Sequence, residues 1–157
     1  MAGSADSESM DFLRRALGKY PRMHGYYLLN FVPLSPTWRV DEEESLSAAF
    51  EMLDDHPWKP PEMRPDGQLW VDYEVDETTA CAHVIAALGG GAEVGHARDT
   101  IPERTAAELW KKFRDLFSPD TRFFLGVGPG DSTYVFQQGA IAVDDAKAGC
   151  FCVIEND

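Results

Sequence analysis

The stretch Gln68-Leu-Trp-Val-Asp-Tyr-Glu-Val-Asp-Glu77 has the clearest periodicity in the sequence, because apolar and acidic residues alternate along it. Successive side chains of a β-strand point to opposite faces of a sheet, so this pattern predicts a strand over residues 68–77. The inner face of that strand would carry Leu69, Val71, Tyr73 and Val75. The outer face would carry a tryptophan followed by carboxylates, namely Trp70, Asp72, Glu74 and Asp76.

The segments on either side of this stretch predict an α+β fold. Apolar residues at helical spacing predict helices over about 10–19, 41–55, 79–88 and 100–117. Apolar runs bounded by turn residues predict further strands over about 26–32, 122–127, 133–143 and 150–154. Short turns join the last three strands, which favours an antiparallel meander. We expect a mixed or antiparallel sheet of about five strands, with about four helices mainly on one face.

Three local features refine this expected fold. Residues 26–32 form a nearly continuous apolar run, which is typical of a central strand covered on both faces. Gly139 interrupts the longest predicted strand, and a glycine there indicates a β-bulge. Residues 1–9 are small and polar, so we expect a disordered N-terminal tail followed by a single domain over residues 10–157.

The charge balance disfavours some classes of function. The chain has 157 residues, in which 27 Asp and Glu outnumber 14 Lys and Arg, and its formal charge is −13. A negative field repels nucleic acids and anionic membranes and attracts basic partners, so we expect no direct nucleic-acid binding and no membrane association. The first residues lack a signal-peptide pattern, and no apolar run approaches the roughly 18 residues of a membrane span. With three cysteines and no disulfide-scaffold spacing, these features predict a cytoplasmic protein.

Motifs for cofactor and metal binding are weak. The glycine run Gly89–Gly91 follows a predicted helix, where a helix stop is expected, whereas a phosphate-binding loop follows a strand. Cys150 and Cys152 share one face of a predicted strand, but no second pair of metal ligands accompanies them, which favours core packing. We therefore expect no metal and no cofactor. The alternative hypothesis for function is a small intracellular enzyme with a site built from loop residues around His56, His96 and Gly89–Gly91.

Cys81 is the remaining candidate for a catalytic nucleophile. It shares the apolar face of a predicted helix with Val84, Ile85 and Leu88, and burial there would raise the pKa of its thiol. The four histidines are scattered, and the sequence places none of them beside Cys81. A cysteine enzyme is therefore not favoured, and we predict no catalytic residues.

The outer face of residues 68–77 is the leading candidate for a binding surface. Its carboxylates would stand about 7 Å apart along an extended strand, which resembles the phosphate repeat of a nucleic-acid strand. Charge complementarity speeds association, and aromatic side chains supply buried anchors. We predict a partner-binding site made of Trp58, Trp70, Asp72, Glu74, Asp76 and Glu77.

The expected partner is a protein with a basic surface, such as a nuclease or another toxin or effector. A module of this kind would neutralise or regulate the partner by occupying its basic cleft. In small size, acidity and α+β content the chain loosely resembles the immunity proteins of toxins and the inhibitors encoded by viruses and phages. That resemblance is one of general character, since no family motif is present.

Overall fold

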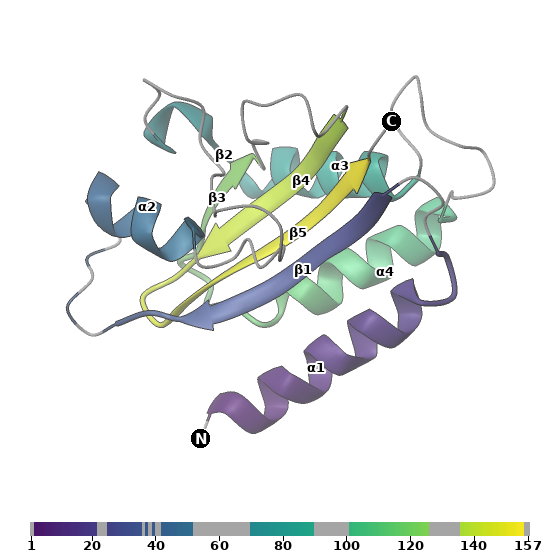
Figure 1. Cartoon of the computed structure of the whole chain (residues 1–157), viewed down its shortest axis with the longest axis horizontal. Helices are drawn as coiled ribbons and strands as arrows, with labels where there is room; N and C mark the ends of the chain where they lie inside the picture. The colour runs from purple at the N-terminus through teal and green to yellow at the C-terminus, as the bar shows by residue number, and fades with distance from the viewer. Residues whose placement is uncertain are drawn as a thin grey trace.

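Five antiparallel strands form one sheet in the part of the chain that the computed structural model describes, residues 2–21, 25–35, 37, 39, 42–51, 70–89, 101–125 and 136–155. The strands are β1 (Gly25–Pro33), β2 (Glu74–Val75), β3 (Arg122–Leu125), β4 (Phe136–Val143) and β5 (Lys147–Glu155). Their order across the sheet is β1-β5-β4-β3-β2, and every neighbouring pair is antiparallel (Figure 1). The predicted α+β fold is confirmed, and so is the meander formed by β3, β4 and β5.

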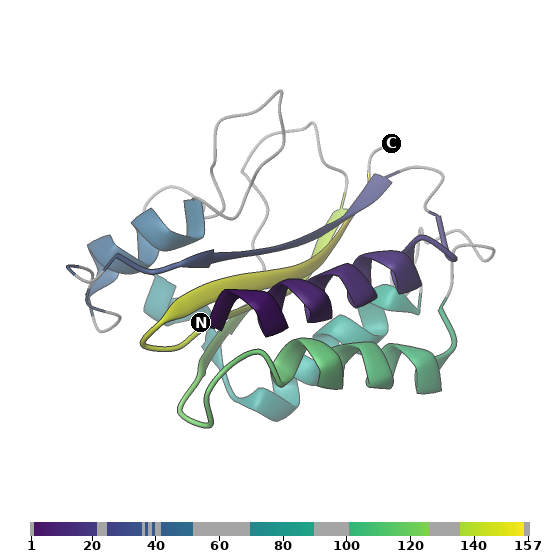
Figure 2. The same cartoon turned by 90° about the horizontal axis from the view of Figure 1, so that it is seen from below.

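The helices are divided unequally between the two faces of the sheet. Those of the described ranges are α1 (Ala2–Leu17), α2 (Glu43–Glu51), α3 (Glu77–Leu88) and α4 (Glu103–Arg114). Figure 2 shows α1, α3 and α4 as one layer beneath the sheet, while α2 lies on the opposite side. This arrangement confirms the expectation of helices mainly on one face.

The central strands have apolar side chains on both faces because both faces are covered. In β5, Phe151 and Val153 belong to the larger core cluster between the sheet and the layer of α1, α3 and α4, whereas Cys150 and Cys152 belong to the smaller cluster on the α2 side. Both thiols are fully buried. The two cysteines are therefore core residues, as the sequence indicated.

The apolar run over residues 26–32 is a strand, but it lies at the edge of the sheet, so the prediction of a central strand was wrong. The run reflects coverage of both faces: Leu29 belongs to the larger core cluster and Leu28 to the smaller one. Burial of the faces does not determine whether another strand lies alongside. A continuous apolar run thus reports the layers above and below a strand and not its position across the sheet.

Some backbone N–H and C=O groups on the open edge of β1 form hydrogen bonds with side chains of the same chain. Leu34 N–H donates to the Ala146 carbonyl just beyond the end of the β1–β5 pairing. Backbone groups of an antiparallel strand point alternately toward and away from the neighbouring strand, so the N–H and C=O groups of even-numbered β1 residues bond to β5 and those of odd-numbered residues face the open edge. On that edge, the Leu29 carbonyl accepts from Arg14 at 3.3 Å and Phe31 N–H donates to the Asn30 side chain at 2.9 Å. Such bonds make an edge strand a poorer template for pairing with another chain.

The first helix begins earlier than the sequence indicated. We expected a tail over residues 1–9, yet α1 begins at Ala2. Asp6 explains part of this difference, because its carboxylate lies 2.7 Å from Lys147 Nζ in β5 and both side chains are about five-sixths buried, with 16% and 15% exposed. An ion pair to a residue 141 positions away cannot be read from a local pattern of small polar residues.

A buried aspartate fixes the turn between β4 and β5. Asp144 is 4% exposed, and its Oδ1 accepts from the backbone N–H groups of Ala146 and Lys147. Its Oδ2 accepts from Ser118 N–H, 26 residues away. One carboxylate therefore closes the hairpin and attaches it to the segment that joins α4 to β3.

Gly139 is a point of close approach between β4 and β5, and the predicted β-bulge is absent. The pairing of the two strands is continuous from Phe136 opposite Glu155 to Val143 opposite Ala148, with no extra residue. Gly139 has a φ of 151°, and a Cβ built there would overlap the Phe151 carbonyl oxygen and lie 2.5 Å from Cys152 Cα. The strands approach more closely than any side chain at this position allows.

Replacing Gly139 with alanine is expected to lower the free energy of unfolding by at least about 3 kcal/mol, because the strained φ and the backbone overlap add together. Chemical denaturation followed by circular dichroism measures this change. Gly18→Ala is the matched control, since its Cβ would lie 3.4 Å from the nearest backbone oxygen, at the margin of ordinary contact. Equal stability of the two variants would contradict the close approach of β4 and β5.

Candidate functional site

Residues 70–77, which we call the acidic segment, form three short elements where one strand was predicted. Trp70–Tyr73 is a 3-10 helix (η1), Glu74–Val75 is β2, and Asp76 is the N-cap of α3. The predicted strand over 68–77 was therefore wrong except at two residues, and Gln68 and Leu69 lie outside the described ranges. A 3-10 helix has about three residues per turn, so alternation in the sequence does not become alternation between two faces.

The predicted inner face of the acidic segment changes accordingly. Val75 packs against the larger core cluster and Tyr73 is half-buried, but the side chain of Val71 is 52% exposed. The prediction of Val71 as a core residue was wrong. The acidic segment therefore contains an exposed apolar residue as well as carboxylates.

Glu74 is held by a two-point contact with Arg122 of β3. Arg122 Nη2 donates to Glu74 Oε1 at 2.7 Å, and Arg122 Nε donates to Oε2 at 3.0 Å. These hydrogen bonds lower the pKa of Glu74 below its ordinary value, against the opposing effect of partial burial. The pair joins β2 to β3 and keeps the carboxylate ionised and fixed in direction.

Asp76 and Glu77 hold the start of α3. Asp76 Oδ1 accepts from Thr79 N–H at 2.7 Å, and this hydrogen bond lowers the pKa of the aspartate. Glu77 Oε1 lies 2.9 Å from Arg114 Nε near the end of α4, and Arg114 also donates to the Ser118 carbonyl. These carboxylates therefore have structural roles that the sequence alone did not reveal, and both remain exposed to solvent.

The structure places only part of the predicted partner-binding site. Glu74, Asp76 and Glu77 come together where β2 meets α3. Trp58 lies outside the described residues, and only the backbone is described for Trp70 and Asp72. In the alternative enzyme site, Gly89 is the C-cap of α3, with its N–H bonded to the Ile85 carbonyl at 3.0 Å, while His56, His96 and Gly90–Gly91 lie outside the described residues.

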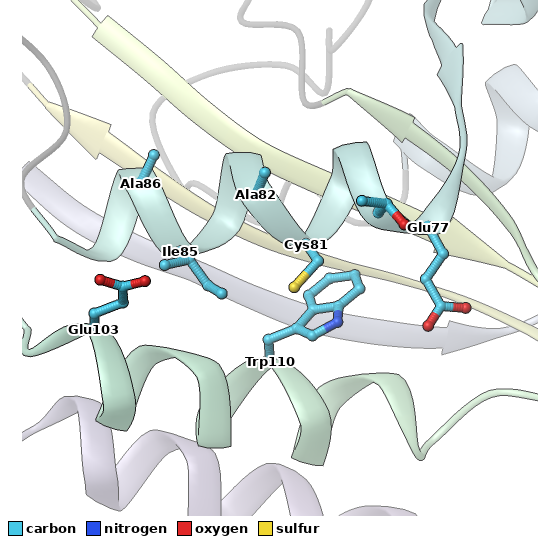
Figure 3. A pocket seen from close by; sticks show the side chains of 8 residues that line it. Glu77, Cys81, Ala82, Ile85, Ala86, Glu103 and Trp110 are labelled. Atoms are coloured by element: carbon cyan, nitrogen blue, oxygen red, sulfur yellow. The ribbon is translucent and has the colours of Figure 1, made fainter.

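A groove that the sequence did not reveal begins at the acidic segment and runs between α3 and α4 (Figure 3). Its volume is about 620 Å³. Figure 3 shows Glu77 at one end and Glu103 at the other, with Cys81 and Trp110 pointing toward one another between them. The residues that line it are Glu77, Thr78, Cys81, Ala82, Ile85, Ala86, Glu103 and Trp110. The spacing of Cys81 and Ile85 on one helix is a sequence signal, but the partner helix cannot be inferred from it.

The aromatic floor of the groove is part of the core. Trp110 is 5% exposed, and its ring centroid lies 5.8 Å from that of Phe113 and 5.8 Å from that of Phe123. These contacts fix the indole in one orientation. The groove is therefore a preformed feature of the packing between α3, α4 and the sheet.

The chemistry of the groove does not support catalysis by Cys81. Burial raises the pKa of the Cys81 thiol, and the negative charge of Glu77 raises it further. The thiol is therefore less ionised at neutral pH than that of a free cysteine. Within the described ranges, no three His, Cys, Asp or Glu side chains are grouped so as to hold a metal ion. In the same ranges, no helix is both long and apolar enough to cross a membrane.

Comparison with protein-family models, with curated proteins and with solved structures gave no match. The function is therefore inferred from the fold and the site themselves. The described chain has an α+β fold, an acidic segment that leads into α3, and an open apolar groove beside that segment.

The contact between Glu74 and Arg122 should contribute to stability in a pH-dependent way. Because folding lowers the pKa of Glu74, its contribution is complete above its ordinary value of 4.5 and is lost as the pH falls through the lower folded value. Glu74→Gln should lower the free energy of unfolding by about 0.5–1 kcal/mol at neutral pH, with a smaller difference in acid. Urea denaturation at several pH values measures both quantities. Glu8→Gln, which removes the same charge from an exposed position on α1, is the control, and a pH-independent effect of Glu74→Gln would contradict this assignment.

Proposed function

We propose that this chain is a binding module for a basic protein and that the acidic segment is its contact surface. The observation that carries the proposal is that Val71, Asp76 and Glu77 are all exposed within one eight-residue segment, because apolar and acidic residues exposed in the same segment suit a partner with both basic and apolar groups. The partner would be an enzyme or toxin, and this chain would occupy and neutralise its basic cleft. We also propose that this chain acts in the cytoplasm. Trp58, Trp70 and Asp72 complete the proposed surface.

Val71 is distinguished from the other exposed large apolar residue of the described ranges, Phe12. Phe12 is 47% exposed, but the ammonium group of Lys112 lies over its ring, 5.0 Å from the ring centroid. A cation over an aromatic face stabilises that ring in water. Val71 is the more exposed of the two at 52%, and this favours the acidic segment over α1 as the contact surface.

The ion pairs of the acidic segment influence how it would bind. Arg122 and Arg114 fix Glu74 and Glu77 in place, which lowers the conformational entropy lost on binding. The same arginines cancel part of the local negative charge, so the exposed carboxylate of Asp76 would supply more of the local attraction. The charge of −13 on the whole chain would add long-range steering, which is screened by salt.

Support for the alternative of a small enzyme is weaker. Its proposed loop residues, His56 and His96, have no described geometry. The cysteine that lines the groove has a raised pKa, which is unfavourable for a nucleophile. The binding module therefore accounts for more of the described structure.

Affinity capture with the chain as bait tests the proposal, using extracts of cells in which the chain naturally occurs. The wild-type chain should retain a protein with a basic surface, and retention should fall as the salt concentration rises. Asp72→Asn combined with Asp76→Asn should lower the affinity for that protein about three- to tenfold, because two carboxylate charges of the acidic segment are lost. Asn is as good an N-cap as Asp, so α3 is expected to remain intact.

The control for this experiment is Glu8→Gln combined with Asp11→Asn on α1. It changes the net charge by the same amount but leaves the acidic segment untouched. The ion pair that it removes, between Asp11 and Arg14 at 3.9 Å, joins exposed side chains and is therefore weak. Equal losses in the two double variants would show that only net charge matters. Unchanged capture by the Asp72 and Asp76 variant, or an acidic partner, would refute the proposed surface.

A further inference from the structure

We propose that the groove between α3 and α4 binds an amphipathic basic helix of the partner. This inference rests on the proposed function, since it names the structural class of partner that the surface beginning at Glu77 would accept. It adds a second contact region, formed by Cys81, Ala82, Ile85 and Ala86, to the acidic segment.

The exposed face of α3 is unusual for a surface helix. After Glu77, α3 contains no Asp, Glu, Lys or Arg, although such residues make up 26% of the chain. Ala82 and Ala86 are exposed, and Cys81 and Ile85 are half-buried beside them. A helix that is apolar on nearly all sides is usually covered on all sides. The outward face of α3 is therefore suited to contact with another protein element.

The charges at the ends of the groove indicate what kind of element would fit. Glu77 stands at the start of α3, and the exposed Glu103 on α4 lies at the opposite end of the groove, where Ile85 and Ala86 also line it (Figure 3). Ala86 is nine positions after Glu77, and at a rise of about 1.5 Å per residue the two lie about 13.5 Å apart along the helix axis. An occupant with a cation at each end and apolar side chains between them complements this groove.

An α-helix fits this geometry better than a strand. The groove lies between α3 and α4, which run antiparallel, because Glu77 contacts Arg114 near the end of α4 and Ile101 N–H bonds to the Leu88 carbonyl at 2.9 Å. A third helix can lie in such a groove at an interaxial distance of about 8–10 Å. The small side chains of Ala82 and Ala86 permit that approach.

Other occupants are disfavoured by the charges around the groove. An anionic ligand would face Glu77 and Glu103, and a second copy of the chain would bring another net charge of −13 to the same surface. Addition of a strand would require an open sheet edge, which the groove lacks. On the edge of β1, two backbone groups already bond to Arg14 and Asn30.

The geometry also specifies a sequence pattern for the bound helix. Positions i and i+7 lie on one face about two turns apart, at roughly 10.5 Å, with i+3 and i+4 between them. Lys or Arg at i and i+7 would reach the two glutamates, given the length of their side chains. Leu or Met at i+3 and i+4 would contact Ile85 and the edge of Trp110.

Synthetic peptides of about 18 residues test the inference, since helices of this length form measurably in water. One peptide carries the pattern of Lys at i and i+7 with Leu at i+3 and i+4, a second has Glu in place of the two Lys, and a third has the first composition in scrambled order. Fluorescence anisotropy of labelled peptides, titrated with the full chain, gives the affinities. The patterned peptide should bind at least about tenfold more tightly than either of the others.

Variants of the chain locate the binding site. Ala82→Lys should weaken binding of the patterned peptide at least about tenfold, because it fills the groove and adds a repelling charge, and Glu103→Gln about threefold. Both positions are exposed, so the fold should tolerate the changes. Glu8→Gln is the charge-matched control for Glu103→Gln and should leave the affinity unchanged.

The thiol of Cys81 provides a readout that does not depend on any variant. Cys81 is partly exposed, whereas Cys150 and Cys152 are buried. Alkylation of Cys81 by iodoacetamide should slow at least about fivefold when the patterned peptide is saturating, and the scrambled peptide should have no effect. Peptide mapping by mass spectrometry identifies the modified cysteine.

Three results would overturn the inference. They are equal binding of the patterned and scrambled peptides, unaltered alkylation of Cys81 at saturation, and protection of Cys81 by self-association of the chain at high concentration. If the groove fails these tests while the Asp72 and Asp76 variant still loses its captured protein, only the helix-binding inference is wrong. If that capture is also unaffected, the proposed function fails as well.

Discussion

The burial of β4 and β5 on both faces is the constraint on which the remaining structure depends. Because their side chains alternate between a layer of three helices and the single helix α2, apolar residues are needed at nearly every position of β5. Gly139 allows the two strands to approach closely, and Asp144 closes their turn. With this centre fixed, β3 and β2 extend the sheet, and α3 and α4 are placed so that a groove forms between them.

The class of fold could be predicted from the sequence because it depends on local periodicity. Helical spacing in α4 and the turn residues around β3, β4 and β5 are local signals, and the helix and the three strands were confirmed, while the predicted turn over residues 128–131 lies outside the described ranges. The same reasoning failed where distant contacts decide the conformation. The salt bridge from Asp6 to Lys147 accompanies a longer α1, and β1 lies at the edge although its pattern suited a central strand.

The acidic segment illustrates why a site is harder to predict than a fold. Alternation from Leu69 to Asp76 matched a strand, but the N-cap formed by Asp76 and the 3-10 helix before it were compatible with the same residues. Neither Arg114 nor Arg122 is near this segment in sequence, so the ion pairs that hold Glu77 and Glu74 could not be foreseen. The groove was missed for the same reason, since it requires α4 beside α3. What the sequence did provide was the accumulation of carboxylates in one short stretch.

Hydrogen exchange of the backbone amides, measured with and without the captured basic protein, tests the central claim most directly. If the acidic segment and the neighbouring groove form the contact surface, protection on complex formation should concentrate in residues 70–89 and in the first turns of α4. The exposed face of α1 should exchange at the same rate in both states. Protection confined to α1 or β1, with residues 70–89 unchanged, would contradict the account.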